Sequence, residues 1–247
     1  MEKYNNLYFN HDEDFSIIGD IYKEKYDFND DLNNIHKLLD NDSITDIQKN
    51  YYKNMPIFGK NDRKSFLVQD FYEYYDSNDI LKCKYIDFIK KYIKPIFNND
   101  EILYQTTPNI RFHLPNCTNI GKRDGDPNSE VIGLHCDSEF NHPETEINII
   151  LPITDMYDTN SIYFNNIENS LNYKDYNNLN INKNQIYLGY FNKINHYNRT
   201  NKTNKTRVSF DFRIIPKSMY NNSTKESVTH NVKFKIGEYY SIIWNNI

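Results

Sequence analysis

Cysteine, glycine and tryptophan are scarce in this 247-residue chain, which has three, seven and one of them respectively. The cysteines (Cys83, Cys117 and Cys136) are too few and too far apart for a disulfide scaffold or a zinc knuckle. No apolar run approaches the roughly 20 residues that a membrane helix needs. The first residues also lack the apolar segment of a signal peptide. We therefore expect a cytoplasmic protein with no membrane partner.

A dense block of lysine and arginine is missing as well. The net charge is -5, and the lysines of the C-terminal third are scattered among Asn and Thr. Proteins that bind nucleic acids usually carry a basic stripe or patch, so we expect no nucleic-acid partner. Nothing in the sequence indicates an oligomeric state.

Aromatic residues are plentiful, because 22 Tyr and 15 Phe bring the aromatic fraction to 15%. Disordered chains are poor in aromatics, so this composition indicates a folded protein. The length suits one domain of ordinary size, and no internal repeat or Pro/Gly linker divides the chain. We therefore predict a single domain over residues 1–247.

The first part of the chain, residues 1–105, is predicted to be mostly helical, with one helical pattern at 31–39. A clearer helix begins near Ser77 or Asn78, since either is a good N-cap. Pro95 should kink or end it. Its apolar residues recur at i, i+3 and i+4 and form one stripe that favours packing against a sheet: Leu81, Tyr85, Phe88, Ile89, Tyr92, Ile93 and Phe97.

From residue 109 the spacing of apolar residues changes to two, which predicts β-strands. In 109–114, the apolar side chains share one face, while Arg111 and His113 share the other. Many short strands after a helical start predict an α+β protein, with a β-sandwich or barrel over 106–247 that is braced by the N-terminal helices. The other predicted strands are 131–137, 146–153, 161–164, 185–191, 207–215, 232–236 and 239–244.

One triplet has the spacing of a metal site. His135-Cys136-Asp137 closes an apolar segment, and in a strand the side chains of residues i and i+2 point to the same face. An imidazole, a carboxylate and one further histidine form the facial triad of non-haem iron oxygenases. Alone, the pattern His-x-Asp/Glu is a weak signal: His11-x-Glu13 also matches, but it lies in a polar stretch where no strand is predicted.

Two downstream features strengthen the signal. His196 follows the strand at 185–191, in an Asn- and Lys-rich stretch that we expect to be a loop. Eleven residues later (207 minus 196), a strand places Arg207, Ser209, Asp211 and Arg213 on one face. An arginine fork binds a carboxylate in bidentate fashion, and a neighbouring serine hydroxyl adds a hydrogen bond. Each residue alone has a structural explanation, but their combination favours a functional site.

In this order, His135-x-Asp137, His196 and Arg207-x-Ser209 resemble the Fe(II)/2-oxoglutarate-dependent oxygenases of double-stranded β-helix fold. The similarity is narrower to the streptomycin-biosynthesis StrG-like and phytanoyl-dioxygenase-like branches, in the stretches 133–140, 146–154 and 206–213. The resemblance covers roughly residues 109–240. It implies a double-stranded β-helix (jelly-roll, cupin-like) core over 106–247.

The resemblance implies iron(II) at His135, Asp137 and His196, and 2-oxoglutarate at Arg207 with Ser209 as a helper. O2 is the other implied cosubstrate, and Asn148 is expected to touch the cosubstrate or a metal-bound water. The implied reaction is hydroxylation of a C–H bond with release of succinate and CO2. Charged candidates for lining the site favour a small polar substrate such as a sugar or an amino acid: Arg111, His113, Glu139, Asp211 and Arg213.

Two other functions stay open at this point. A cupin-like metal enzyme uses the same barrel without 2-oxoglutarate, and a non-catalytic protein of this fold binds a ligand without reaction.

Overall fold

The computed structural model describes residues 15–18, 28, 32, 66–98, 100–117, 132–164, 176–183, 185–222, 225–228 and 231–244. The His11-x-Glu13 motif lies outside these ranges, as does, apart from Leu32, the helical pattern at 31–39. Within the described ranges, no helix is both long and apolar enough to span a membrane.

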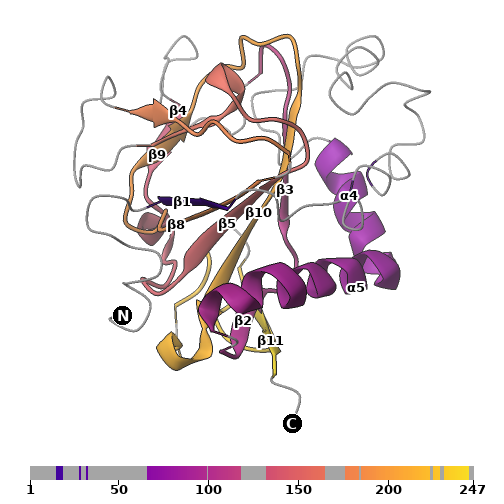
Figure 1. Cartoon of the computed structure of the whole chain (residues 1–247), viewed down its shortest axis with the longest axis vertical. Helices are drawn as coiled ribbons and strands as arrows, with labels where there is room; N and C mark the ends of the chain where they lie inside the picture. Colours follow the sequence, from indigo (N-terminus) through magenta and orange to yellow (C-terminus); the bar gives the residue numbers. More distant parts are fainter. Residues whose placement is uncertain are drawn as a thin grey trace.

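Two antiparallel sheets form the body of the protein (Figure 1). The larger has the order β1-β8-β5-β10-β2-β11, with β3 also paired to β10, and the smaller has the order β4-β9-β6-β7. The strands of the larger sheet are β1 (Phe15–Ile18), β2 (Ile102–Gln105), β3 (Asn109–His113), β5 (Ile147–Pro152), β8 (Ile186–Gly189), β10 (Arg207–Pro216) and β11 (Tyr240–Ile243). Those of the smaller are β4 (Ile132–His135), β6 (Ile162–Phe164), β7 (Asn177–Asn178) and β9 (His196–Asn198).

Two helices cover the larger sheet, α4 (Phe66–Ser77) and α5 (Asp79–Phe88). Asn78 caps α5, since its side-chain oxygen accepts a hydrogen bond from the Leu81 N–H at 2.9 Å. A π-turn (η3, Ile89–Ile93) and a 3-10 turn (η4, Lys94–Phe97) follow, and Asn98 ends them in the left-handed conformation with φ 52°. The predicted cap and the predicted stop near Pro95 are therefore confirmed.

The alternation of β10 divides the molecule into an apolar and a polar side. Val208, Phe210, Phe212 and Ile214 join the main core beneath the helices, where the Phe212 and Tyr85 rings meet edge-on at 5.2 Å. The alternate residues Arg207, Ser209, Asp211 and Arg213 point the other way, toward the smaller sheet. This polar face is buried rather than solvated, since Arg207 and Ser209 are each only 1% exposed.

A second apolar cluster fills part of the space between the two sheets. Ile150 of β5 and Tyr187 of β8 pack there against Phe164 of β6 and against Phe191. The polar face of β10 is thus enclosed between sheets, which is where a site protected from water is expected.

Three predicted boundaries were wrong. The sheets begin before residue 106, because β1 and β2 precede it, and an apolar run as short as Ile102–Gln105 carries no clear period. Residues 232–236 form only isolated bridges, since Phe234 is their one buried side chain and Gly237 (φ 86°) turns the chain into β11. His196 lies on a strand rather than in a loop, because β9 pairs with both β4 and β6.

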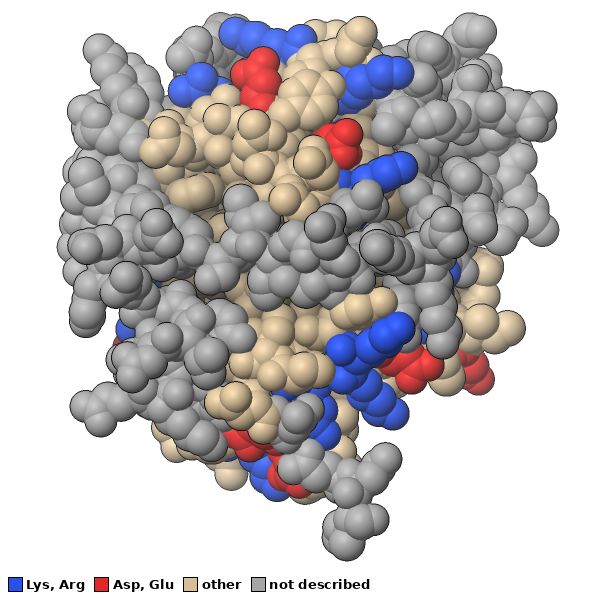
Figure 2. Space-filling view, viewed as in Figure 1, with Lys and Arg blue, Asp and Glu red and all other residues tan. Residues whose placement is uncertain are grey.

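Charges of both signs are mixed on the face seen in Figure 2. A short group of basic side chains lies over α5 in this view, with acidic side chains next to it. On the described part of this face, charges of the two signs therefore lie next to one another and form no long stripe of one sign.

The cap of α5 gives a test of this fold. Replacing Asn78 by Ala removes the acceptor for the Leu81 N–H and should lower the free energy of unfolding by about 1 kcal/mol. Asn78→Asp keeps an acceptor and should stay within a few tenths of the wild-type value. Urea denaturation followed by circular dichroism measures both, and equal stability of Asn78→Ala and wild type would contradict the cap.

Candidate metal centre

The three predicted metal ligands come together. The ligand atoms of His135, Asp137 and His196 all lie within 4.8 Å of one another. Oδ1 of Asp137 is 3.6 Å from Nε2 of His135 and 3.7 Å from Nε2 of His196. Two imidazole nitrogens and one carboxylate oxygen that occupy one face of a metal ion form the donor set that suits non-haem iron(II).

The path of the chain between His135 and Asp137 differs from the prediction. β4 ends at His135, and Asp137 opens a 3-10 turn (η5, Asp137–Phe140) instead of continuing the strand. The turn is tied to the distal histidine's region, because the Asp137 N–H donates to the Phe191 carbonyl at 2.8 Å. The two side chains therefore converge through a strand end and a turn rather than through one pleated face.

Gly133 sets the direction of His135. The pairing of β4 with β9 shifts register between Ile132 and His135, and Gly133 has φ 68°, a conformation that glycine adopts without strain. This backbone turns the Gly133 carbonyl toward its own strand end, where it contacts Nδ1 of His135.

Both histidines are oriented in the same way. Nδ1 of His135 meets the Gly133 carbonyl, and Nδ1 of His196 meets the Ile194 carbonyl at 3.0 Å. Because a carbonyl only accepts, each Nδ1 must carry the hydrogen, and in the neutral ring Nε2 then has a free lone pair facing Asp137. Burial, and next the charge of His135, lower the pKa of His196 to about 4, so this ring is neutral at physiological pH. Such hydrogen bonds to the outer nitrogen are typical of metal-binding histidines.

The second oxygen of Asp137 is held by two donors. Asn148 Nδ2 donates to Oδ2 at 2.9 Å and Arg213 donates to it at 2.8 Å. Asn148 is fixed in turn, because its Oδ1 accepts from the Phe191 N–H at 3.2 Å. Oδ1 of Asp137 is left facing the two histidines.

Ion pairs extend from Asp137 along the inner sheet face. Arg213 also donates to Asp211 at 2.7 Å, and Asp211 accepts from Arg111 at 3.3 Å. Burial alone would raise the pKa of Asp137, but Arg213 and then the histidines outweigh it and hold that pKa well below its usual range. Arg213, between two carboxylates, has its pKa raised well above the ordinary value despite burial. Asp137 is therefore an anion, as a metal ligand must be.

A further buried group was missed in the sequence. Glu146 is fully buried on the segment leading into β5; His142 Nδ1 lies 2.6 Å from its Oε2, and the Tyr240 hydroxyl donates to its Oε1. An acidic residue two positions before Asn148 in an otherwise apolar strand was a usable signal. Tyr240 gave none, because its partner lies 94 positions away in the sequence.

Arg207 lies further along the same inner face. It is 1% exposed and pairs in register with His113 of β3, while Ser209, also 1% exposed, pairs with Arg111. Burial, and then the charge of Arg207, lower the pKa of His113 to about 3. The Arg207 cation is thus enclosed beside a neutral imidazole, an environment that favours an anionic ligand.

The remaining predicted residues have protein partners in the structure. Both ring nitrogens of His113 face backbone carbonyls, those of Asn160 at 3.0 Å and Cys117 at 3.1 Å. Glu139 is exposed and accepts from the Cys136 N–H at 3.1 Å, so it caps the turn that carries Asp137. Arg111 belongs to the ion-pair chain. A substrate contact of these residues stays a prediction.

Comparisons with known proteins add to this geometry. No family model matches the chain. It is similar to the streptomycin biosynthesis protein StrG of Streptomyces griseus, with 26% identity over 172 residues, 69% of this chain and 74% of StrG. The StrG-like resemblance noted from the motifs is thereby confirmed.

Three solved structures have weak likeness in fold. SnoN, a non-heme alpha ketoglutarate dependent epimerase from nogalamycin biosynthesis, has a TM-score of 0.43 at 9% identity over 87% of this chain and 83% of its own. AviO1 of Streptomyces viridochromogenes has 0.42 at 9% identity, over 84% and 91%. HygX of Streptomyces hygroscopicus, with nickel and 2-oxoglutarate bound, has 0.37 at 10% identity, over 87% and 88%.

The support that Asn148 gives Asp137 is testable with the metal alone. Asn148→Leu removes the donor to Oδ2 and should weaken Fe(II) binding by about one to two orders of magnitude. Asn192→Leu is the control: Asn192 is a buried asparagine close by, whose amide donates to the Pro143 carbonyl. Anaerobic competition titration measures both affinities, and a loss of the same size in both variants would contradict the role of Asn148.

The burial of neutral His113 predicts a pH dependence of stability in the metal-free protein. The unfolded chain takes up a proton near the ordinary pKa of 6.5, whereas the folded protein resists it down to about 3. The contribution of His113 is therefore complete above pH 6.5 and is lost as the pH falls toward 3. His196 acts in the same direction down to about 4.

Below pH 6.5, each such histidine should lower the free energy of unfolding by about 1.4 kcal/mol per pH unit. His113→Gln should have a shallower slope than wild type. Urea titrations between about pH 7 and pH 5 measure the slopes. Identical slopes would mean that His113 does not carry this dependence.

Proposed function

We propose that this protein is an Fe(II)/2-oxoglutarate-dependent oxygenase on a double-stranded β-helix core. One observation carries the proposal: two Nε2 lone pairs and Oδ1 of Asp137 converge, while every outer atom of these groups is held by the protein. A surface group of His and Asp would not need such support. The outer hydrogen bonds fix the rings and the carboxylate before any metal arrives.

The donor set fits an open metal site. Three protein ligands on one side of an octahedral ion leave positions for a chelating cosubstrate and O2. When bound, iron(II) and 2-oxoglutarate supply the oxidation, in which the cosubstrate is converted to succinate and CO2. This chain supplies orientation: His135 and His196 are locked in one tautomer, and Arg213 keeps Asp137 ionised.

The position of Arg207 suits the far carboxylate of the cosubstrate. Phe164 of β6 pairs with His196, whereas Asn160, four residues earlier, contacts His113 beside Arg207. Four extended residues span roughly 13 Å. An extended Arg207 side chain would span about half of this distance, and a five-carbon dicarboxylate between its guanidinium and the metal would span the remainder. Ser209, two residues on, is proposed to add a hydrogen bond.

The product is proposed to be an alcohol formed from a C–H bond of a small polar metabolite. The inner face between the sheets is rich in charged and amide groups, and the chain Arg111–Asp211–Arg213 keeps it polar up to Asp137. A long acyl chain placed along these ion pairs would meet charged and amide groups instead of apolar side chains, and it would bury them without supplying hydrogen bonds.

The decisive experiment adds Fe(II) and 2-oxoglutarate to the protein without oxygen. We expect the weak metal-to-ligand charge-transfer band near roughly 500 nm in wild type and its loss in His135→Ala. Arg207→Ala should need about ten to a hundred times more 2-oxoglutarate, because a bidentate charged contact is lost. Arg207→Lys keeps the charge but not the fork and should fall between.

His142→Gln is the matched control for His135→Ala. His142 is a buried histidine that also contacts a carboxylate, that of Glu146, and it is not one of the three ligands. The variant should keep the band. If wild type binds iron but shows no band, 2-oxoglutarate is not the cosubstrate, and a cupin-like metal enzyme becomes the preferred function. Failure to bind iron would reject the metal site and leave a ligand-binding protein.

A further inference from the structure

Phe191 lies outside the proposed ligand set but contacts both of the segments that carry Asp137 and His196. Its carbonyl accepts from the Asp137 N–H at 2.8 Å. Its N–H donates to Oδ1 of Asn148 at 3.2 Å, and Asn148 holds Oδ2 of Asp137. Its ring stacks on the His196 ring, with centroids 4.4 Å apart and an interplanar angle of 24°. Phe191 is only 2% exposed, so water does not compete for these contacts.

The His196 ring needs a second contact because its hydrogen bond leaves one rotation open. The contact of Nδ1 with the Ile194 carbonyl at 3.0 Å sets the tautomer. The torsion that turns an imidazole about its bond to Cβ has a broad energy profile, so one hydrogen bond does not define the plane of the ring. The face of Phe191 does define it. That plane decides whether Nε2 is directed at Oδ1 of Asp137, 3.7 Å away.

The Phe191 ring is supported in turn by Tyr187. These two rings also stack, with centroids 5.5 Å apart and an interplanar angle of 28°, and Tyr187 is fully buried. Gly189 makes room for this arrangement, because a Cβ there would lie 2.4 Å from the Tyr187 hydroxyl oxygen and 2.7 Å from the ring carbon that bears it. The Tyr187 ring therefore lies over Gly189 and reaches Phe191 in the next turn of the chain.

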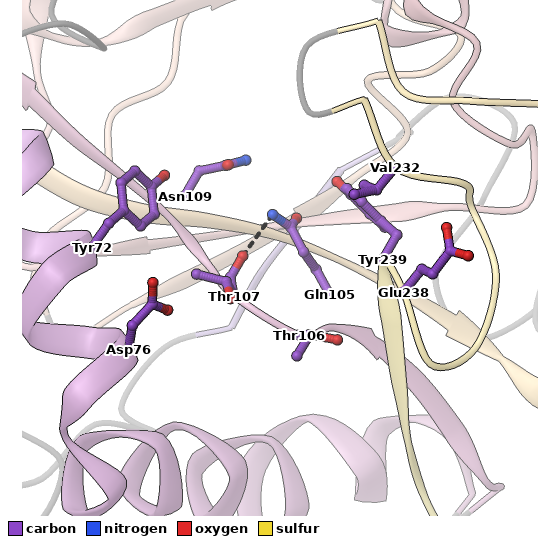
Figure 3. Close-up of a pocket in the computed structure, with 9 residues that line it drawn as sticks. All are labelled: Tyr72, Asp76, Gln105, Thr106, Thr107, Asn109, Val232, Glu238 and Tyr239. Atoms are coloured by element: carbon purple, nitrogen blue, oxygen red, sulfur yellow. Dashed lines mark hydrogen bonds between the residues drawn. The ribbon is translucent and has the colours of Figure 1, made fainter.

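The opposite side of Asp137 is less closely packed. Arg213 leads there to Asp211, and Asn109, the register partner of Asp211, lines a cavity of about 360 Å³ (Figure 3). Side chains that face a cavity have fewer van der Waals contacts to resist a shift. Phe191, in contrast, belongs to the apolar cluster between the sheets. The side of Phe191 is therefore the one that can hold the ligands in a fixed geometry.

We propose that Phe191 is a positioning residue of the metal centre. Its backbone sets the place of Asp137 and Asn148, and its ring, supported by Tyr187, sets the plane of His196. One residue thus couples η5 and β9, the two elements that carry these ligands. Its importance for an iron site rests on the function proposed above, whereas the orientation of the His196 ring does not.

A change of the side chain tests the ring separately from the backbone. Phe191→Leu keeps an apolar side chain and both backbone hydrogen bonds but removes the flat face. We expect the affinity for Fe(II) alone, measured by anaerobic competition titration, to fall by about three- to tenfold, as for the loss of one ring contact. Phe191→Tyr keeps the ring and should recover most of the wild-type affinity.

Phe97→Leu is the matched control. Phe97 is also fully buried, but it belongs to the main core beneath the helices. Both leucine variants should lose a comparable amount of stability in urea, because each leaves a cavity of similar size in an apolar cluster. Only Phe191→Leu should weaken Fe(II) binding.

The orientation of the His196 ring is measured directly in the metal-free protein. Long-range proton–nitrogen NMR distinguishes a protonated ring nitrogen from one with a free lone pair, and His196→Gln identifies the signals of His196. Wild type should have a protonated Nδ1, a free Nε2 and ring protons shifted upfield by the face of Phe191. In Phe191→Leu the upfield shift should vanish, and the two nitrogen signals should approach each other. Phe97→Leu should keep the wild-type spectrum.

Gly189→Ala tests the support of Phe191 from the other end. The added Cβ displaces the Tyr187 ring, so the affinity for Fe(II) should fall as it does in Phe191→Leu. If the effect passes through the Phe191 ring, the double variant should bind Fe(II) no more weakly than Phe191→Leu. Additive losses would overturn the role of Tyr187, since Gly189 would then act through Asn148, its register partner.

Unchanged Fe(II) affinity in Phe191→Leu would overturn the proposal, as would an equal loss in Phe97→Leu. If wild type binds no Fe(II), the proposed function fails, and the NMR spectra still decide whether Phe191 orients His196. If wild type binds Fe(II) but the His196 signals of Phe191→Leu match those of wild type, the iron site stands and the positioning role is rejected.

Discussion

The carboxylate of Asp137 is the group on which the inner structure depends. A buried carboxylate next to two imidazoles is stable only if cations and hydrogen-bond donors compensate the loss of water. Arg213 and Asn148 supply this compensation, and Arg213 in turn requires Asp211. Each charged side chain in this series of contacts needs a charged or hydrogen-bonding neighbour, because it is buried away from water. The result is a polar layer on the inner face of the larger sheet, next to the apolar cluster that fills part of the space between the two sheets.

This layer also explains the state of the proposed ligands. A backbone carbonyl holds Nδ1 of His135 and of His196, and burial keeps the His196 ring neutral, so that a lone pair points inward. The carboxylate remains charged because its cation is fixed. Two imidazole nitrogens and one anionic oxygen are thus oriented by the fold before a metal binds. Arg207 is also buried, further along β10, where its guanidinium is held in place for the proposed anionic cosubstrate.

Much of the site was predictable because its residues sit at short, regular spacings. The two-residue alternation of β10 placed Arg207, Ser209, Asp211 and Arg213 on one face, and the structure has them so. The cap at Asn78 followed from its side-chain chemistry. The strand at β9 was not predictable, because its pairing partners β4 and β6 lie far away in sequence and its own residues are polar. Neither was the turn at Asp137, which depends on the Phe191 carbonyl.

Which polar side chains the site can use follows from the sequence alone: the histidines, the aspartates and the arginines, and the faces that they share within one strand. Local geometry suffices for this, since a pleat has a fixed period. Their contact partners, in contrast, depend on the three-dimensional fold. Arg213 was a candidate substrate contact in the sequence and holds Asp137 in the fold; Glu146 meets Tyr240 across 94 positions. Such pairs depend on how the sheets are closed, and sheet closure is a long-range property that no local pattern records.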